Sequence, residues 1–484
     1  MKPFKYVPRL FEGALALLLL GTAVDVAAAP CDTFYPAGFS LSQNKLTTAP
    51  PATARPARGV AVTEPAQRTC IARATDHSAD GVSGYAVNDE SRRQPFNADN
   101  SRFLVVAGDG AWYLYDANSL KKIAKLAGPS GAAEPQWHPT DPNTLYYVPA
   151  NGGTKLYALN VSTNASRVVA DFAGKLPWSK AAHVWSKSKG SPSGDVRYWG
   201  FQVEDANFRI LGYAVWDLQA NRLVGSKSVS VRPDHVSMSP SGRWFIASGS
   251  DGTYAWSPDF KQKKQLHTRA EQSDIAIGAD GHDVFVSIDY QSGDGSVFMV
   301  DIDTGARTDL FPTYLNGSYT ALHVSGKAYG KPGWALVSTY AGSASRDGSR
   351  PWYLDQVFAL ELKAQPRIYP IAFHRSRTGS NRAEPRAAVN RDFSRILYSS
   401  NWGGSGDEAL DAYLIGLPAT ALGASGTTPP PANVPPVAGF TVGSNGLGAT
   451  FTDTSTDSDG SIASRAWNFG DGQRDGVGAG RGVG

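Results

Sequence analysis

Six polar residues recur at comparable places along the chain, each just before or inside a short apolar stretch. They are Gln136 in EPQWHP, His183 in AAHVWS, His235 in PDHVSM, Asp274 in QSDIAI, His323 in ALHVSG and Arg386 in EPRAAV. An imidazole can remove a proton, and a guanidinium can bind a carboxylate through two parallel hydrogen bonds. With a proton donor added, such groups could abstract the proton beside a carboxylate and expel an oxygen from the next carbon.

The chemistry of these side chains suggests their individual roles. His235 and His323 are the candidate bases and Arg386 is the candidate carboxylate clamp. The candidate proton donor is Tyr319 or Tyr290. The remaining members would bind the ligand, together with one tryptophan that could stack on a sugar ring: Gln136, His183, Asp274 and Trp402. The competing interpretation is structural, because polar groups near a core normally bond to adjacent loops and aromatic residues mostly pack in cores.

Several standard catalytic motifs are absent from the sequence. It contains no G-x-S-x-G, no Walker loop, no H-E-x-x-H and no C-x-x-C. These absences argue against serine hydrolase, nucleotide-binding and zinc-protease chemistry. Any site must therefore be built from residues that the fold gathers from distant parts of the chain.

The candidate residues are carried by a repeated layout of short strands. Each copy has an apolar strand, a tight polar turn, a second apolar strand, a loop and a third strand that ends in polar residues. Seven copies begin at Phe96, Trp137, Gly190, Val236, Ile275, Ala321 and Asn390. The spacing of their turns brackets the roughly 40 to 50 residues of a four-stranded propeller blade. The sequence therefore predicts an all-β fold, a seven-bladed β-propeller whose closed ring removes exposed sheet edges.

Residues just before the innermost strands of a propeller surround the mouth of its channel, where pockets tend to form. The alignment of turns puts the six polar residues there, and Glu134 and Glu384, each followed by Pro, fall at matching points of the second and seventh copies. The seventh copy shows only three clear strands, so we predict that a segment between Cys70 and Val87 supplies the missing edge. The propeller would then cover residues 96–417, and residues 30–95 would lead into it.

The composition of the sequence changes after Leu417. Residues 418–436, PATALGASGTTPPPANVPP, are Pro-rich and lack an apolar period, as is typical of a semi-extended linker. The runs FTDTSTDSDGSI and WNFGDG follow, and with them residues 437–484 resemble the PKD domain, an immunoglobulin-like β-sandwich module of secreted bacterial and archaeal proteins. The resemblance covers the first half of such a module, and QRDGVGAGRGVG stands where further strands belong. We expect a partial, truncated module with an uncovered sheet edge.

Stretches such as SPSGRWFIAS and EPRAAVNRDFSRILYSSNWGG resemble secreted propellers of the oligogalacturonate-lyase and TolB-like type. The resemblance implies a metal held by His and Gln at the channel, which neutralises a uronate carboxylate while a base removes the adjacent proton. The family's histidine-rich ligand stretch corresponds here to RAEPRAAV, which contains Arg386 and no His. We therefore predict no cofactor and keep a divalent metal as the alternative, for which the expected ligands are not all present.

Residues 1–29 have the pattern of an export signal, with a basic start, the apolar run of residues 14–23 and small residues near Ala29. The apolar run is too short to form a permanent transmembrane anchor. We expect cleavage near Ala29 and a secreted protein, either extracellular or periplasmic. In an exported chain two cysteines favour a disulfide over a metal site, so we predict a bond between Cys31 and Cys70.

The charge of the chain limits its partners. Its 484 residues carry a net charge of +3, from 46 basic and 43 acidic residues, with no block of Lys and Arg. A nucleic-acid-binding protein would show such a block, so we expect no nucleic-acid partner. We predict a monomer that binds a polysaccharide or a cell-surface glycan. The alternative is a polysaccharide lyase that cleaves a uronate-containing polymer by β-elimination at the channel mouth.

Overall fold

The computed structural model describes residues 29–187, 189–423, 437–445, 448–456, 466–467 and 475–476. The expected signal segment up to residue 28, most of the expected linker and most of the expected C-terminal module lie outside these residues. The described chain forms short β-strands with two single-turn 3-10 helices, η1 (Asn381–Ala383) and η2 (Asp407–Ala409). None of its helices has the length and apolar character needed to cross a bilayer. The all-β prediction is confirmed.

Five sheets contain four strands each, and in each of them the strands pair antiparallel in chain order. Each is therefore a meander of local hairpins, as the repeated layout predicts. Their strands are β7 (Gln136–Trp137), β8 (Thr144–Tyr147), β9 (Lys155–Asn160), β10 (Ala165–Asp171); β11 (His183–Trp185), β12 (Tyr198–Glu204), β13 (Ile210–Asp217), β14 (Arg222–Ser228); β15 (His235–Met238), β16 (Phe245–Gly249), β17 (Gly252–Trp256), β18 (Lys263–His267); β19 (Ser273–Ile277), β20 (Asp283–Ile288), β21 (Val297–Asp301), β22 (Arg307–Phe311); and β23 (Tyr319–Ser325), β24 (Trp334–Ser343), β25 (Gln356–Glu361), β26 (Ile368–Phe373).

A nine-stranded sheet joins the two ends of the folded chain. In it β29 pairs with β28 and β2, while β3 pairs with β4 and continues to β5 and β6. The two parts meet at one parallel contact, between Asp411 of β29 and Ala86 of β3. The strands are β1 (Ala61–Thr63), β2 (Cys70–Arg73), β3 (Ala86–Val87), β4 (Arg102–Ala107), β5 (Ala111–Asp116), β6 (Lys122–Ser130), β27 (Ala388–Val389), β28 (Arg395–Ser400) and β29 (Asp411–Gly416).

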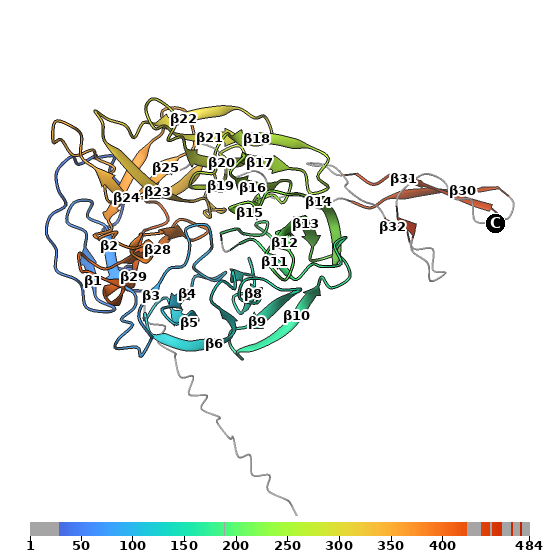
Figure 1. Cartoon of the computed structure of the whole chain (residues 1–484), viewed down its shortest axis with the longest axis horizontal. Coiled ribbons are helices and arrows are strands. Elements are labelled where there is room, and N and C mark those ends of the chain that lie inside the picture. Colours follow the sequence, from blue (N-terminus) through green and yellow to red (C-terminus); the bar gives the residue numbers. More distant parts are fainter. Residues whose placement is uncertain are drawn as a thin grey trace, which may run out of the picture.

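The sheets follow one another in chain order around a ring (Figure 1). Strands β11, β15, β19 and β23 lie toward the middle, and β14, β18 and β22 lie at the outside. Apolar cores form between neighbouring sheets, for example where Phe172 of the turn after β10 packs edge-on against Trp216 of β13, with ring centroids 5.1 Å apart. Burying both faces of each sheet in this way explains why the middle strands are almost continuously buried.

The segment between Cys70 and Val87 contributes β2, which pairs antiparallel with β29. The fully buried side chain of Asp411 holds this junction together. Its Oδ2 accepts hydrogen bonds from Arg55 at 2.7 Å and Arg73 at 2.6 Å. Its Oδ1 accepts hydrogen bonds from the Thr75 hydroxyl at 3.0 Å and the His77 backbone N–H at 2.9 Å. One carboxylate thus ties the N-terminal segment to the last strand of the ring.

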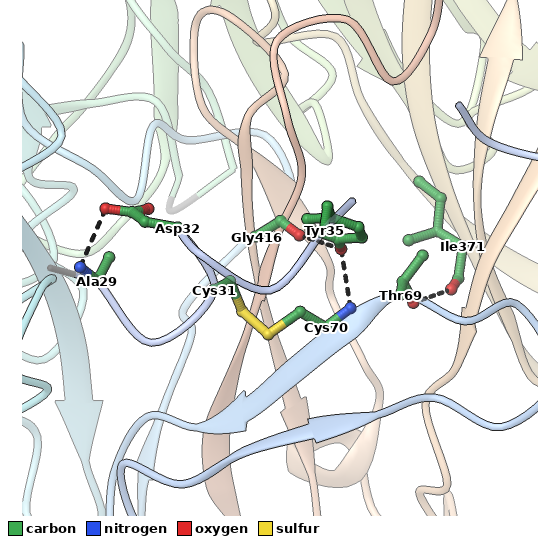
Figure 2. The surroundings of a disulfide bond; sticks show 8 residues. All are labelled: Ala29, Cys31, Asp32, Tyr35, Thr69, Cys70, Ile371 and Gly416. Atoms are coloured by element: carbon green, nitrogen blue, oxygen red, sulfur yellow. Dashed lines mark hydrogen bonds between the residues drawn. A yellow bond between two sulfur atoms is a disulfide. The ribbon is translucent and has the colours of Figure 1, made fainter. Parts of the chain in front are cut away.

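The predicted disulfide between Cys31 and Cys70 is present, at the opposite end of β29 (Figure 2). The hydroxyl of Tyr35 donates to the carbonyl of Gly416 at 2.5 Å and accepts from the backbone N–H of Cys70 at 2.8 Å. The absence of a side chain at Gly416 leaves room for Cys31, because a Cβ added at residue 416 would lie 2.5 Å from the Cβ of Cys31. The disulfide and Tyr35 therefore fasten the first described residues to β2 and β29.

The described C-terminal residues form two small hairpins. Strand β30 (Phe440–Asn445) pairs with β31 (Gly448–Asp453), and β32 (Ala466–Trp467) pairs with β33 (Asp475–Gly476). The rings of Phe440, Phe451 and Trp467 lie 5.8 to 6.1 Å apart. Phe440 nevertheless remains 59% exposed, so this small aromatic contact buries little surface.

Candidate functional site

The six aligned polar residues lie on or just before the first strand of successive sheets. Gln136, His183 and His235 begin β7, β11 and β15; Asp274 is in β19, His323 is in β23 and Arg386 precedes β27. All except His183 and Arg386 are below one-tenth exposed. Whether they act on a ligand depends on which of them are already held by other parts of the protein.

The centre of the ring is filled by a run of polar residues that follows β3. This run, NDESRRQP at residues 88–95, is here called the plug segment. Arg92 donates to the carbonyl of Ser273 and to Gln272, and its own carbonyl accepts from the hydroxyl of Ser191 at 2.5 Å. Gln94 donates to the carbonyl of Lys327 at 2.6 Å.

The far end of the plug segment is held by the last sheet. Asn88 donates to the carbonyl of Arg386 at 2.5 Å, and Arg386 donates to the carbonyl of Asp89 at 3.1 Å. Because its partners belong to four different sheets, the plug segment spans the middle of the ring. It brings further charged groups to the predicted channel mouth.

A cluster of three charged residues, one histidine and one tyrosine lies beside the plug segment. His323 Nε2 is 3.0 Å from Glu384 Oε2, and the imidazole stacks on Tyr340 with centroids 4.7 Å apart. Arg386 lies 3.5 Å from Glu384 and 3.4 Å from Glu90 of the plug segment. We call these five residues, His323, Glu384, Arg386, Glu90 and Tyr340, the mouth cluster. Its three charged side chains are about 15% exposed, so the cluster lies at the edge of solvent.

The protonation of the mouth cluster follows from burial and charge. Burial lowers the pKa of His323, although the Glu384 carboxylate opposes the change. Burial acts to raise the pKa of Glu384, but the hydrogen bond to His323 and the charge of Arg386 together hold it below its usual value. Burial and the Glu384 charge raise the pKa of Tyr340. At neutral pH the cluster therefore contains an ionised carboxylate, a neutral imidazole and a protonated phenol.

His235 lies in a second polar group at the start of β15. Its side chain is buried, and Nδ1 is 3.2 Å from the carboxylate of Asp234, which also pairs with Lys189 at 3.1 Å. Burial and the charge of Arg92 lower the pKa of His235 to about 4, even though Asp234 favours the charged form. The imidazole is thus neutral at physiological pH and faces the plug segment.

The protein should lose stability in acid because of His235. The folded pKa is about 4, whereas an unfolded histidine titrates near 6.5. Between these two pKa values the histidine is protonated in the unfolded state but not in the folded state. The free energy of unfolding therefore falls by about 3 kcal/mol as the pH drops from 6.5 to 4. Urea unfolding at several pH values would measure this slope. The slope of the unfolding free energy against pH should be shallower in His235→Gln and unchanged in the control His183→Gln. Equal slopes in His235→Gln and the unaltered protein would contradict it.

Gln136 and Asp274 are already bound by neighbouring sheets. Gln136 donates to the carbonyl of Gly190 at 3.0 Å. Asp274 accepts from the backbone N–H of Gly326 at 2.7 Å and pairs with the buried Lys327 at 3.0 Å. These contacts join the beginning of one inner strand to the end of another, which is the structural alternative considered for such residues.

The other two predicted ligand-binding residues, His183 and Trp402, make their contacts outside the mouth cluster. His183 interacts with the carbonyl of Asn151 at 3.0 Å and stacks on Phe208. Trp402 donates to the carbonyl of Thr53 and stacks on Tyr413, with centroids 4.8 Å apart. Trp402 therefore packs against the N-terminal segment.

Of the two tyrosines considered as proton donors, neither belongs to the mouth cluster. Tyr319 is 53% exposed and lies four residues before His323, a separation of about 13 Å along an extended strand. Tyr290 is partly buried, and burial raises its pKa. Tyr340 is the tyrosine that contacts His323.

The donor set at the mouth does not suit a divalent metal ion. The carboxylates of Glu384 and Asp274 each pair with a cationic side chain. In the described part of the chain the one group of three potential ligands is Asp280, His282 and Asp301, beyond the end of β19 that is opposite Asp274. One oxygen of Asp301 already accepts backbone N–H groups of its own turn. No metal-dependent step is assigned to either place.

Sequence reasoning missed three members of this region. Glu90 and Arg92 were not identified, because consecutive polar residues ordinarily indicate a solvated loop. A signal was present in the neighbours of the run: NDESRRQP lies directly between the buried strand β3 and the buried Phe96. Tyr340 was missed because it reaches His323 from the neighbouring strand β24. Glu384 was noticed as part of a Glu-Pro pair but received no role.

Comparison with known proteins identifies the fold. No family model matches the chain. An oligogalacturonate lyase solved in complex with manganese has a TM-score of 0.52 and 16% identity, covering 74% of this chain and 96% of that one. The oligogalacturonate lyase from Vibrio parahaemolyticus has a TM-score of 0.53 and 11% identity, with the same coverage. At these identities the likeness shows the fold alone, which is propeller-like.

One short segment matches a curated protein more closely. It is 74% identical over 34 residues to Xanthomonalisin from Xanthomonas sp. (strain T-22). The match covers 7% of this chain and 4% of that protein. The chain thus spans only a small fraction of this relative's length.

Proposed function

We propose that the chain is an exported, monomeric, seven-bladed β-propeller that binds extracellular or cell-surface glycans at the mouth of its ring. The blade count is supported by the sheet topology. The nine-stranded sheet divides at its single parallel contact into β3 to β6 and the group of β27, β28, β29, β2 and β1. With the five four-stranded sheets, this division gives seven units.

The observation that carries the proposal is the mouth cluster itself. Ionised and hydrogen-bonding groups at the edge of solvent are the groups that recognise the hydroxyls and carboxylates of an acidic sugar. The likeness to two oligogalacturonate lyases supports a polysaccharide as the partner, since those two proteins are named for their action on oligogalacturonate. The PKD resemblance of residues 437–484 is consistent with an exported protein that has an accessory module.

Binding is favoured over catalysis because the predicted clamp and base are engaged within the protein. Arg386 pairs with Glu90 and Glu384, and it donates to the Asp89 carbonyl. His323 is 4% exposed and its Nε2 is bonded to Glu384. A substrate would have to displace these contacts before either group could act on it.

A polysaccharide lyase is the second candidate, and one observation favours it. The neutral imidazole of His323 lies against the protonated phenol of Tyr340, an arrangement of base and acid. In β-elimination the base takes the proton on the carbon beside the carboxylate, and that electron pair forms a carbon–carbon double bond. The bond to the leaving oxygen breaks and the oxygen takes a proton from Tyr340. Arg386 would stabilise the carboxylate while charge develops.

Affinity gel electrophoresis of the full chain, combined with ultraviolet absorbance, tests both candidates. We expect retardation in gels that contain polygalacturonate, alginate or a glycosaminoglycan, no retardation in neutral dextran, and no absorbance from unsaturated ends. Replacing Glu90 and Arg386 by Gln should weaken binding at least about tenfold. A rise in absorbance that disappears in His323→Gln would instead establish the lyase. Unchanged migration in every gel with flat absorbance would refute both.

A further inference from the structure

A cavity lies on the outer part of the ring, between the sheet of β11 to β14 and the sheet of β15 to β18. Its volume is about 310 Å³, which is at the lower end of the range for small-molecule sites. Its floor and walls include Tyr213, Tyr254 and Trp256, and two lysines and one acid reach into it: Lys227, Lys263 and Asp251. None of these residues belongs to the mouth cluster or contacts the plug segment in the described structure. We call this cavity the side groove.

The two lysines of the side groove are held by aromatic rings. The ammonium of Lys227 lies 4.7 Å from the centroid of Trp256, and that of Lys263 lies 5.0 Å from the same ring. Lys263 is also 3.6 Å from the centroid of Tyr254. Among the described residues neither lysine forms an ion pair with a carboxylate. The cation–π contacts therefore fix the position of both charges without neutralising them.

Two like charges at one indole, neither of them in an ion pair among the described residues, create a position that favours an anion. Because both ammonium groups lie close to the Trp256 centroid, they are at most about 10 Å apart, which is within about one Debye length at moderate ionic strength. The two charges therefore repel each other, and salt weakens this repulsion. An anionic group between them would replace this repulsion by two attractions, in a geometry that is already formed.

The remaining walls provide what a sugar ring requires. Trp256 and Tyr254 are half-buried and offer apolar ring surface. Burial, assisted by the charge of Asp251, raises the pKa of Tyr213 to about 12, so its hydroxyl stays protonated and able to donate. The exposed Asp251 carboxylate can accept hydrogen bonds from sugar hydroxyls. An anion without hydroxyls would be repelled by the Asp251 carboxylate and would form no hydrogen bond with it.

We infer that the side groove binds an acidic sugar unit of an anionic polysaccharide, with the carboxylate of the sugar between Lys227 and Lys263 and its hydroxyls facing Asp251. This site is additional to the mouth cluster and would let one polymer chain engage the propeller at two places. The inference relies on the proposed function only for the class of polymer. A polymer that contacts both sites would bind more tightly than either site alone allows.

The test measures binding of polygalacturonate to the full chain by affinity gel electrophoresis at low and moderate salt. The variant Lys227→Gln/Lys263→Gln should bind at least tenfold more weakly, and its remaining binding should depend less on salt. The control Lys155→Gln/Lys261→Gln removes the same charge from two exposed positions and should bind as the unaltered protein does. Lys227→Arg/Lys263→Arg should retain most of the affinity. Equal thermal midpoints would show that the variants remain folded.

Additional polymers decide the chemistry of the ligand. Fully methyl-esterified polygalacturonate, which lacks the charge, should bind the unaltered protein no better than the Gln variant binds polygalacturonate. If dextran sulfate depends on the two lysines and polygalacturonate does not, the assignment of a carboxylate sugar is overturned. If polygalacturonate binds and the groove variant binds equally well, the side groove is refuted while the proposed function stands. If the unaltered protein binds no anionic polymer, both are refuted.

Discussion

Asp411→Ala is expected to lower the free energy of unfolding by about 3 to 5 kcal/mol, the usual loss when one partner of a buried ion pair is removed. Asp411 is fully buried, and its carboxylate accepts from Arg55 and Arg73 as well as from Thr75 and His77. The substitution would leave Arg73, whose side chain is 14% exposed, without its closest acidic partner at the ring junction. The effect should appear as an earlier transition in urea, followed by tryptophan fluorescence.

Two further variants make this measurement specific. Asp411→Asn keeps an oxygen for the hydrogen bonds from Thr75 and His77 but removes the charge, so it should lose less stability than Asp411→Ala. Asp109→Ala breaks an exposed pair with Lys125 at 3.8 Å and should change stability by less than about 1 kcal/mol. A loss in Asp411→Ala no larger than that of Asp109→Ala would mean that the junction does not carry the stability assigned to it.

The fold could be predicted because it is built from local hairpins. Alternating apolar residues, polar turns and a recurring spacing are all visible in the sequence, and β20 and β21 pair antiparallel as neighbours along the chain. The need for a strand from residues 70–87 followed from the incomplete seventh copy, and β2 lies within that segment. The identity of the ties at the junction did not follow, since Asp411 meets its partners only after the ring has formed.

The contents of the mouth were harder to predict because they depend on contacts between distant residues. Alignment by turns can bring His323 and Arg386 to the same end of the ring, but it cannot show that Glu384 joins them. It also could not select the tyrosine. In the pairing of β23 with β24, His323 lies opposite Ser338 and Ala321 lies opposite Tyr340, so Tyr340 is the diagonal neighbour of His323. The register of this hairpin thus determines which phenol approaches the imidazole.

The plug segment illustrates a further limit. Residues 88–95 are polar and yet mostly buried, a combination that is stable only when nearly every polar group finds a partner. Arg92 and Gln94 find theirs in sheets that lie about 180 and 230 residues farther along the chain. No local pattern encodes such pairs. The functional consequence is that the plug segment occupies the middle of the ring, so a ligand would bind at the mouth cluster or in the side groove.

The double substitution Cys31→Ser/Cys70→Ser should lower the free energy of unfolding by about 4 kcal/mol, because the bond closes a loop of 39 residues and restricts the unfolded chain. The urea transition would measure the loss, and the unaltered protein under reducing conditions should match the variant. If the N-terminal segment only rested on a ring that closes by itself, the global transition would not move and proteolysis before residue 61 would alone increase. That result would contradict the prediction.

The two largest predicted losses concern opposite ends of the same strand. Asp411 and Gly416 bound β29, about 17 Å apart along an extended strand, and the disulfide lies at the Gly416 end. Sites so far apart ordinarily contribute additively. If the ring closes as one cooperative event, however, losing either tie already frees β2 from β29, and the combined variant should lose less than the sum. A double-mutant cycle on Asp411→Ala and the disulfide therefore measures whether β2 packs on a ring that is already closed or takes part in closing it.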